Sequence, residues 1–154
     1  MHNSTFLASA AAVLLAAAAA GASAEPVTFT GSATYTAQRE LLPLSNGGAA
    51  VHVTNRVIGT LTPSDSSGFI FGDCAGLAYI SPEGEVTIDN LCTFMENDTD
   101  GFTIRGRAGV EGGKSEVIGG TGRFEGATGQ GRMRRTWLEG NRGSVEYEFR
   151  MELK

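Results

Sequence analysis

The sequence predicts an all-β protein, an eight-stranded antiparallel up-and-down barrel, with a β-sandwich as the second choice. Three observations predict this class. Apolar and polar residues alternate with a period of two, clusters of Gly, Pro, Asn, Asp and Ser separate the alternating segments, and no helical period beyond residue 24 lasts longer than a turn. A barrel of roughly eight strands can hold one small ligand in its interior.

The N-terminal segment is predicted to be a secretory signal peptide over residues 1–24. Residues 6–20 are apolar and uncharged, and Ala22-Ser23-Ala24 matches an A-x-A type cleavage site. The apolar run is short for a membrane span, although the leader lacks Lys and Arg, and an uncleaved anchor is the alternative. We therefore expect a secreted or periplasmic protein with one domain over 25–154 and no membrane span after cleavage.

Strands are predicted at about 27–38, 50–62, 68–80, 85–96, 101–110, 114–119, 128–138 and 145–154. The first and last show the clearest alternation. One face of the first carries Val27, Phe29, Ala33, Tyr35 and Ala37, and one face of the last carries Val145, Tyr147, Phe149, Met151 and Leu153. Many other strand positions are Gly or Ala, which fits a strongly coiled small barrel and leaves interior volume for a guest.

The two cysteines, Cys74 and Cys92, lie on either side of a Pro/Gly turn signal at 81–84. An even number of cysteines in an exported protein suggests a disulfide. The midpoint of the two positions falls inside that turn, so an antiparallel hairpin would place them directly opposite each other. Directly opposed Cα atoms lie roughly 4.5–5.5 Å apart, which is within bridging range.

Charge and composition exclude several partners. The formal net charge is −5, with 17 acidic and 12 basic residues, which argues against nucleic-acid binding through bulk electrostatics. The basic run Arg132, Arg134 and Arg135 is interpreted as a solvated strand face rather than an anion site. Two cysteines and His52 are too few ligands to predict zinc, so we expect no metal and no cofactor.

The stretch 117–129, VIGGTGRFEGATG, is rich in glycine but does not fit a nucleotide-binding loop. Its glycines lack the G-x-G-x-x-G spacing, and the residues after it look like a strand rather than a helix. A structural turn is the better interpretation, because glycine allows positive φ at a tight corner and an aromatic residue can tuck into the core below it. The residues of this turn are Gly119, Gly120, Gly122, Phe124, Gly126 and Gly129.

This turn resembles the G-G-T-G-[RK]-F-x-G-A-x-G turn of the allene oxide cyclase/dirigent barrel superfamily, including bacterial exported allene oxide cyclase barrel-like proteins. The order of a Cys strand at 91–94, an acidic turn at 97–101 and the glycine turn at 119–129 is also similar. The resemblance implies an eight-stranded, calycin-like barrel. Plant allene oxide cyclases steer the ring closure of an unstable epoxide, and dirigent proteins steer radical coupling, both chiefly by positioning a reactive guest. Their functional residues cannot be carried over, because the match does not extend to those strands.

The predicted Cys74–Cys92 register divides the hairpin into two faces, and the pattern alone does not decide which one lines the barrel. If the face with Asp73, Tyr79 and Asp89 points inward, these residues form a polar cluster and become weak candidates for a general acid or base. If the cysteine face points inward, the interior is nearly apolar and simple binding is favoured. The second arrangement is slightly preferred, because burying charge is costly.

Three functions remain open. The first is an exported barrel that binds a small hydrophobic or aromatic molecule without converting it. The second is a cofactor-independent cyclase or isomerase that steers a reactive guest with a carboxylate or a tyrosine. The third is a structural or interaction protein whose barrel is filled by its own side chains. Related plant barrels suggest a homo-oligomer, and the sequence leaves the oligomeric state open.

Overall fold

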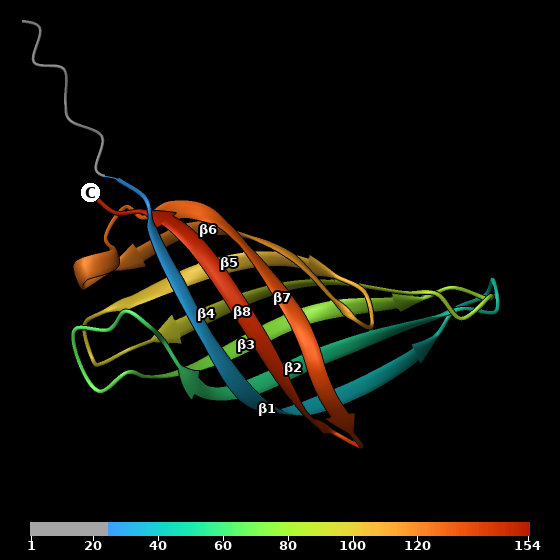
Figure 1. Ribbon diagram of the computed structural model, residues 1–154. Helices are drawn as coiled ribbons and strands as arrows, with labels where there is room; N and C mark the ends of the chain where they lie inside the picture. Colours follow the sequence, from blue (N-terminus) through green and yellow to red (C-terminus); the bar gives the residue numbers. More distant parts are fainter. Residues whose placement is uncertain (1–24) are drawn as a thin grey trace, which may run out of the picture.

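The computed structural model describes residues 25–154, which form a closed antiparallel barrel in the order β1-β2-β3-β4-β5-β6-β7-β8. The predicted signal peptide lies outside the described residues. Figure 1 shows β1 lying beside β8, and the pairing of these two strands closes the barrel. The strands are β1 (Val27–Pro43), β2 (Ala49–Thr60), β3 (Phe69–Ile80), β4 (Val86–Met95), β5 (Gly101–Ala108), β6 (Gly112–Thr121), β7 (Thr128–Glu139) and β8 (Arg142–Glu152), and the 3-10 helix η1 (Gly122–Phe124) precedes β7.

The predicted alternation is confirmed, because the apolar face of each terminal strand points into the barrel. Phe29 and Ala33 of β1 and Tyr147, Phe149 and Met151 of β8 are all buried. Successive side chains of a strand point to opposite sides of the sheet, so the intervening polar residues face outward. The barrel class predicted from this alternation is therefore correct.

Three strands, β1, β6 and β8, extend beyond their predicted ends by more than one residue, and β8 begins at Arg142 instead of at the predicted residue 145. β1 continues past residue 38 to Pro43, which pairs with Ala49 of β2, so a two-stranded hairpin protrudes from the barrel. β6 includes glycines that the sequence pattern had marked as a break. A Cβ on Gly113 would lie 2.1 Å from the carbonyl oxygen of Arg107, so the strands can approach this closely only because glycine has no side chain.

Aromatic side chains fill one end of the barrel. Phe102 lies 5.2 Å from Phe124 and 5.6 Å from Phe149 between ring centroids, and Phe29 lies 5.7 Å from Phe124. Phe124 comes from η1, which lies at the same end as the C-terminus in Figure 1. This end is therefore a packed apolar core, and the β1–β2 and β3–β4 hairpins extend from the opposite end.

A buried ion pair ties the loops together at the aromatic end. The Arg123 Nε donates to the Glu96 carboxylate at 2.7 Å, and the Glu96 side chain is fully buried. Ser64 donates to the same carboxylate, and Arg123 also pairs with Asp65 at 3.1 Å. Asp100 accepts hydrogen bonds from the Asn97 amide and from the Arg123 backbone N–H, which lower its pKa. The network fixes η1 against the turns that precede β3 and β5.

The predicted disulfide is confirmed. Cys74 and Cys92 are directly paired across β3 and β4, with a Cα–Cα distance of 4.0 Å and a sulfur–sulfur distance of 2.05 Å. Both residues are buried and face the barrel interior. The cysteine face of the β3–β4 hairpin is therefore the face that lines the barrel.

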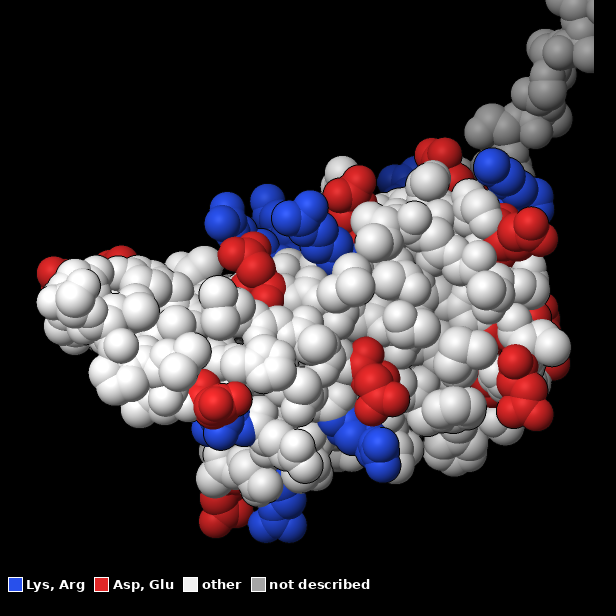
Figure 2. Space-filling model, turned by 180° about the vertical axis from the view of Figure 1, so that it is seen from behind, with Lys and Arg blue, Asp and Glu red and all other residues white. Residues whose placement is uncertain are grey.

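The outer surface carries charges of both signs. Figure 2 shows acidic and basic side chains close together over much of one face, and fewer charges on the tapering end. Several outward pairs join neighbouring strands, such as Arg132 with Glu148 and Arg134 with Glu146 on β7 and β8. In the part of the chain that the structure describes, no helix has the length and apolar character needed to cross a membrane.

Candidate ligand-binding pocket

A cavity of about 340 Å³ occupies the half of the barrel away from the aromatic core. The cavity exists because the side chains at the interior positions become smaller from the packed end of the barrel toward the other end. On β1, Phe29 at the packed end gives way to Ala33 and Ala37 beside the cavity, and on β3 Ile70 gives way to Gly76 and Ala78. The volume lies at the low end of the roughly 300–1,000 Å³ typical of small-molecule sites.

The cavity wall is mainly apolar. Its larger apolar side chains come from β2, β3, β4, β7 and β8 and from the β5–β6 turn: Val51, Val53, Val57, Ile80, Val86, Ile88, Phe94, Val110, Met133, Leu138 and Val145. Among the described residues that line it there is no Asp or Glu. An apolar guest could therefore be transferred from water into this space without removing water from a carboxylate of the wall.

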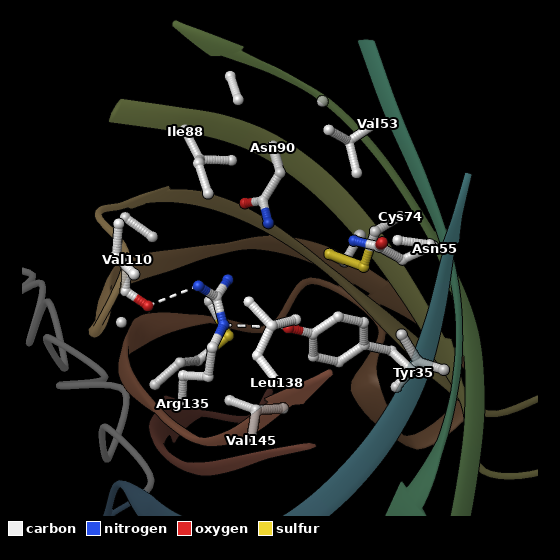
Figure 3. Close-up of a pocket in the computed structure, with 18 of the residues that line it drawn as sticks. Tyr35, Val53, Asn55, Cys74, Ile88, Asn90, Val110, Arg135, Leu138 and Val145 are labelled. Atoms are coloured by element: carbon white, nitrogen blue, oxygen red, sulfur yellow. Dashed lines mark hydrogen bonds between the residues drawn. A yellow bond between two sulfur atoms is a disulfide. The ribbon is translucent and has the colours of Figure 1, made fainter. Parts of the chain in front are cut away.

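Arg135 of β7 provides the cationic group that Figure 3 shows reaching into the cavity. Its Nε donates to the Tyr35 hydroxyl oxygen at 3.0 Å, and its Nη1 donates to the Val110 carbonyl at 2.5 Å. Val110 lies in the turn between β5 and β6, so contacts from two sides of the barrel hold the guanidinium in place. A second arginine, Arg39 of β1, also lines the cavity and is exposed.

Two asparagines supply polar groups on the opposite wall. Asn55 of β2 and Asn90 of β4 both line the cavity, and their side-chain oxygens are buried with no hydrogen-bond partner among the described residues. Figure 3 shows the Asn90 amide and the Arg135 guanidinium pointing into the same space. A buried acceptor without a donor is costly, so a water molecule or a guest with an O–H or N–H group would stabilise these positions.

The boundary with the packed end is formed by Tyr147 and the disulfide. The Tyr147 hydroxyl donates to the Thr60 carbonyl, and burial raises the pKa of the phenol. Its proton is therefore held in an internal hydrogen bond at neutral pH. Tyr147 also stacks near Phe149, with ring centroids 5.3 Å apart, which places an aromatic surface at the cavity floor.

The sequence candidates for acid–base chemistry lie on the outer face of the hairpin. Asp73 forms an exposed ion pair with Arg56, and Asp89 forms one with Arg107. The Tyr79 hydroxyl accepts a hydrogen bond from the Asn46 amide in the β1–β2 turn. None of the three candidates lines the cavity, because the cysteines of the same hairpin occupy the inner face.

Sequence reasoning did not single out the polar residues that line the cavity. Arg135 was interpreted as part of a solvated face with Arg132 and Arg134, yet it points inward while those two point outward. The sequence contained a signal for this, because residues two apart on a strand point to the same side of the sheet. Arg135 lies two residues after Met133, whereas Arg132 and Arg134 occupy the alternate positions. In the same way, Asn55 lies two residues before the buried Val57, and Asn90 lies two residues before the buried Cys92. This alternation identifies cavity residues only once the inward-facing side of each strand is known.

In the described range 25–154, no group of three or more His, Cys, Asp or Glu side chains is arranged to hold a metal ion. The polar groups of the cavity are instead the amides of Asn55 and Asn90, the phenols of Tyr35 and Tyr147, and the guanidinium groups of Arg39 and Arg135. These groups donate and accept hydrogen bonds, and the guanidinium groups favour anions.

The barrel is similar in fold to two solved dirigent proteins. The barrel is similar to the pterocarpan synthase dirigent protein GePTS1, with a TM-score of 0.57 and 17% identity over 98% of this chain and 100% of that chain. It is also similar to the pterocarpan synthase dirigent protein PsPTS1, with a TM-score of 0.51 and 15% identity over 81% of this chain and 95% of that chain. The sequence matches no protein-family model and no curated protein.

Proposed function

We propose that this protein is exported and holds one small, mainly apolar or aromatic molecule inside the barrel. The observation that carries the proposal is the cavity of about 340 Å³, whose wall is mainly apolar. The disulfide supports export, because disulfides persist in oxidising compartments. The cavity also argues against a barrel filled by its own side chains.

The polar groups of the wall suit a guest that is not purely hydrocarbon. The unpaired oxygens of Asn55 and Asn90 would accept hydrogen bonds from a hydroxyl or N–H group of the guest. The Tyr35 hydroxyl accepts from Arg135, which leaves its own proton free to be donated into the cavity. A substituted aromatic molecule fits this arrangement better than an alkane does.

A second candidate function is steering the reaction of the bound guest, as in a cyclase or an isomerase. The similarity in fold to pterocarpan synthase dirigent proteins favours it. The pair formed by Tyr35 and Arg135 also favours it, because a phenol beside a cation inside a cavity can donate a proton or stabilise a developing negative charge. A site that holds a guest in one geometry needs few other groups.

Binding can be tested with N-phenyl-1-naphthylamine, a neutral apolar fluorophore that brightens in apolar surroundings. We expect a saturable rise in fluorescence with the oxidised protein. The variant Ala78→Phe should reduce binding at least tenfold, because the added ring would occupy the cavity that Ala78 lines. Ala75→Phe is the matched control, since Ala75 lies on the exposed face of the same strand.

Thermal unfolding of both variants checks that each remains folded. Binding that is unaffected by Ala78→Phe, or that is lost equally in Ala75→Phe, would place the fluorophore outside the barrel and contradict the proposal. No saturable binding by the folded wild-type protein would also contradict it.

A further inference from the structure

We propose that the guest is an amphipathic carboxylate, whose anionic group binds Arg135 while its apolar body fills the barrel. This inference rests on the proposed function and names the chemical class of the ligand. It predicts that charge, as well as apolar surface, determines which molecules the cavity accepts.

The first argument is that Arg135 forms no ion pair with a carboxylate of residues 25–154. Arg132 and Arg134, on the same strand, pair with Glu148 and Glu146, whereas no ion pair of Arg135 is found among the described residues. The backbone N–H of Arg135 donates to the backbone carbonyl of Glu111, which follows Val110 in the sequence. The exposed Glu111 side chain does not line the cavity.

The second argument is the contrast between the cavity and the whole chain. The chain has a formal net charge of −5, yet the described cavity lining contains two arginines and no acidic residue. The groups around the Arg135 guanidinium are a phenol, a carbonyl and apolar side chains such as Leu138 and Val145. A cation among such groups creates a positive potential inside the cavity, which favours an anionic guest.

The third argument is geometric. A guanidinium has five N–H donors in a planar fork, and Arg135 uses two of them, on Tyr35 and Val110. These two contacts orient the guanidinium and leave three N–H groups for a ligand. Because Nε is bonded to Tyr35, the end of the fork formed by Nη1 and Nη2 is the part that can face the two oxygens of a carboxylate.

The test compares two probes of nearly the same shape, 2-naphthoate and its neutral amide 2-naphthamide, by isothermal titration calorimetry near neutral pH. A hydrogen bond to a charged group contributes about 1.5–3 kcal/mol, so we expect wild-type protein to bind the naphthoate roughly ten- to a hundredfold more tightly. Arg135→Met should abolish that preference, so that the naphthoate binds no more tightly than the naphthamide.

Arg134→Met is the matched control, because Arg134 lies next to Arg135 in the sequence but faces outward. It should leave the preference unchanged. Arg135→Lys provides a second variant that keeps the charge but not the fork, and it should retain an intermediate preference. Far-ultraviolet circular dichroism checks that the variants are folded.

Equal affinity for the two probes in wild-type protein, or a preference that persists in Arg135→Met, would overturn this inference. If N-phenyl-1-naphthylamine still binds the barrel in that case, the proposed function stands and only the ligand class is wrong. If the neutral fluorophore, the naphthoate and the naphthamide all fail to bind, both proposals fail together.

Discussion

Replacing Arg123 with Met should destabilise the barrel strongly, because it removes the cation from a buried ion pair. The Glu96 side chain is 0% exposed and the Arg123 side chain is 18% exposed, so little water can replace the lost contact. Removing one partner of a buried pair costs about 3–5 kcal/mol, since the remaining charge stays buried without compensation. Arg123 also lies over the Phe124 ring at 4.4 Å, a contact that contributes about 0.5–2 kcal/mol. Methionine retains part of the apolar packing, so we expect a total loss of about 3–5 kcal/mol.

The measurement is urea-induced unfolding of the oxidised protein, followed by far-ultraviolet circular dichroism. Arg56→Met is the matched control, because Arg56 pairs with Asp73 while their side chains are 83% and 78% exposed. An exposed pair contributes about 0–1 kcal/mol, so this control should remain close to wild type. A double variant, Glu96→Leu with Arg123→Met, should recover most of the loss, because no buried charge is left.

A loss below about 1 kcal/mol in Arg123→Met would refute the reasoning, because it would show that Glu96 is compensated without its cation. The same conclusion would follow if Arg123→Met and Arg56→Met were equally destabilised. Failure of the double variant to recover stability would instead assign the loss to the packing of Arg123 on the phenylalanine rings.

Three further predictions concern backbone, disulfide and pH. Gly122→Ala should destabilise the protein by more than the roughly 1–2 kcal/mol that left-handed backbone costs a residue with a side chain. The reason is that a Cβ at this position would clash with the Asp100 carboxylate. Gly47→Ala is the control, because Gly47 also has a positive φ but has open space around it. Both variants are measured by urea-induced unfolding. The double variant Cys74→Ala with Cys92→Ala should lose about 3 kcal/mol in the same assay, because the disulfide closes a loop in the unfolded chain, and unchanged stability would contradict this. Finally, hydrogen bonds from Asn97 and from the Arg123 backbone hold the pKa of Asp100 below its ordinary value of 3.8. The stabilisation is fully present above pH 3.8 and is lost as the pH falls through the lower pKa of the folded protein. Asp100→Asn should therefore lose less stability on acidification than the wild-type protein does. Identical stability profiles of the two proteins at acidic pH would exclude this role.

Alternation in single strands predicted most of the barrel, because the two-residue period of a strand is a local property. The faces of β1 and β8 and the pairing of the cysteines followed from positions alone. The ends of β1 and β6 were less accurate. Glycines and charged residues mark breaks in a sequence pattern, but the ladder of backbone hydrogen bonds continues through them when the neighbouring strand approaches closely.

The cavity residues could be predicted only in part. Small residues at strand positions indicated interior space, but only the structure showed that the cysteine face of the β3–β4 hairpin points inward. Tyr35 was placed on the inner face of its strand from the sequence, but its contact with Arg135 joins residues 100 positions apart. No local pattern reports such a contact, since it depends on the closure of the whole barrel.

By itself, the sequence determined the β class, the approximate strands, the disulfide partners and the acidic net charge. Each of these depends on residue types at short spacings. Tertiary structure alone decided that Arg135 points inward and that Asp73 and Asp89 point outward. It also decided that, within residues 25–154, Arg135 has no acidic partner and the side-chain oxygens of Asn55 and Asn90 have no hydrogen-bond donor. The physical reason is that a side chain's environment is set by which strands become neighbours when the sheet closes, and that neighbourhood combines segments distant in the chain.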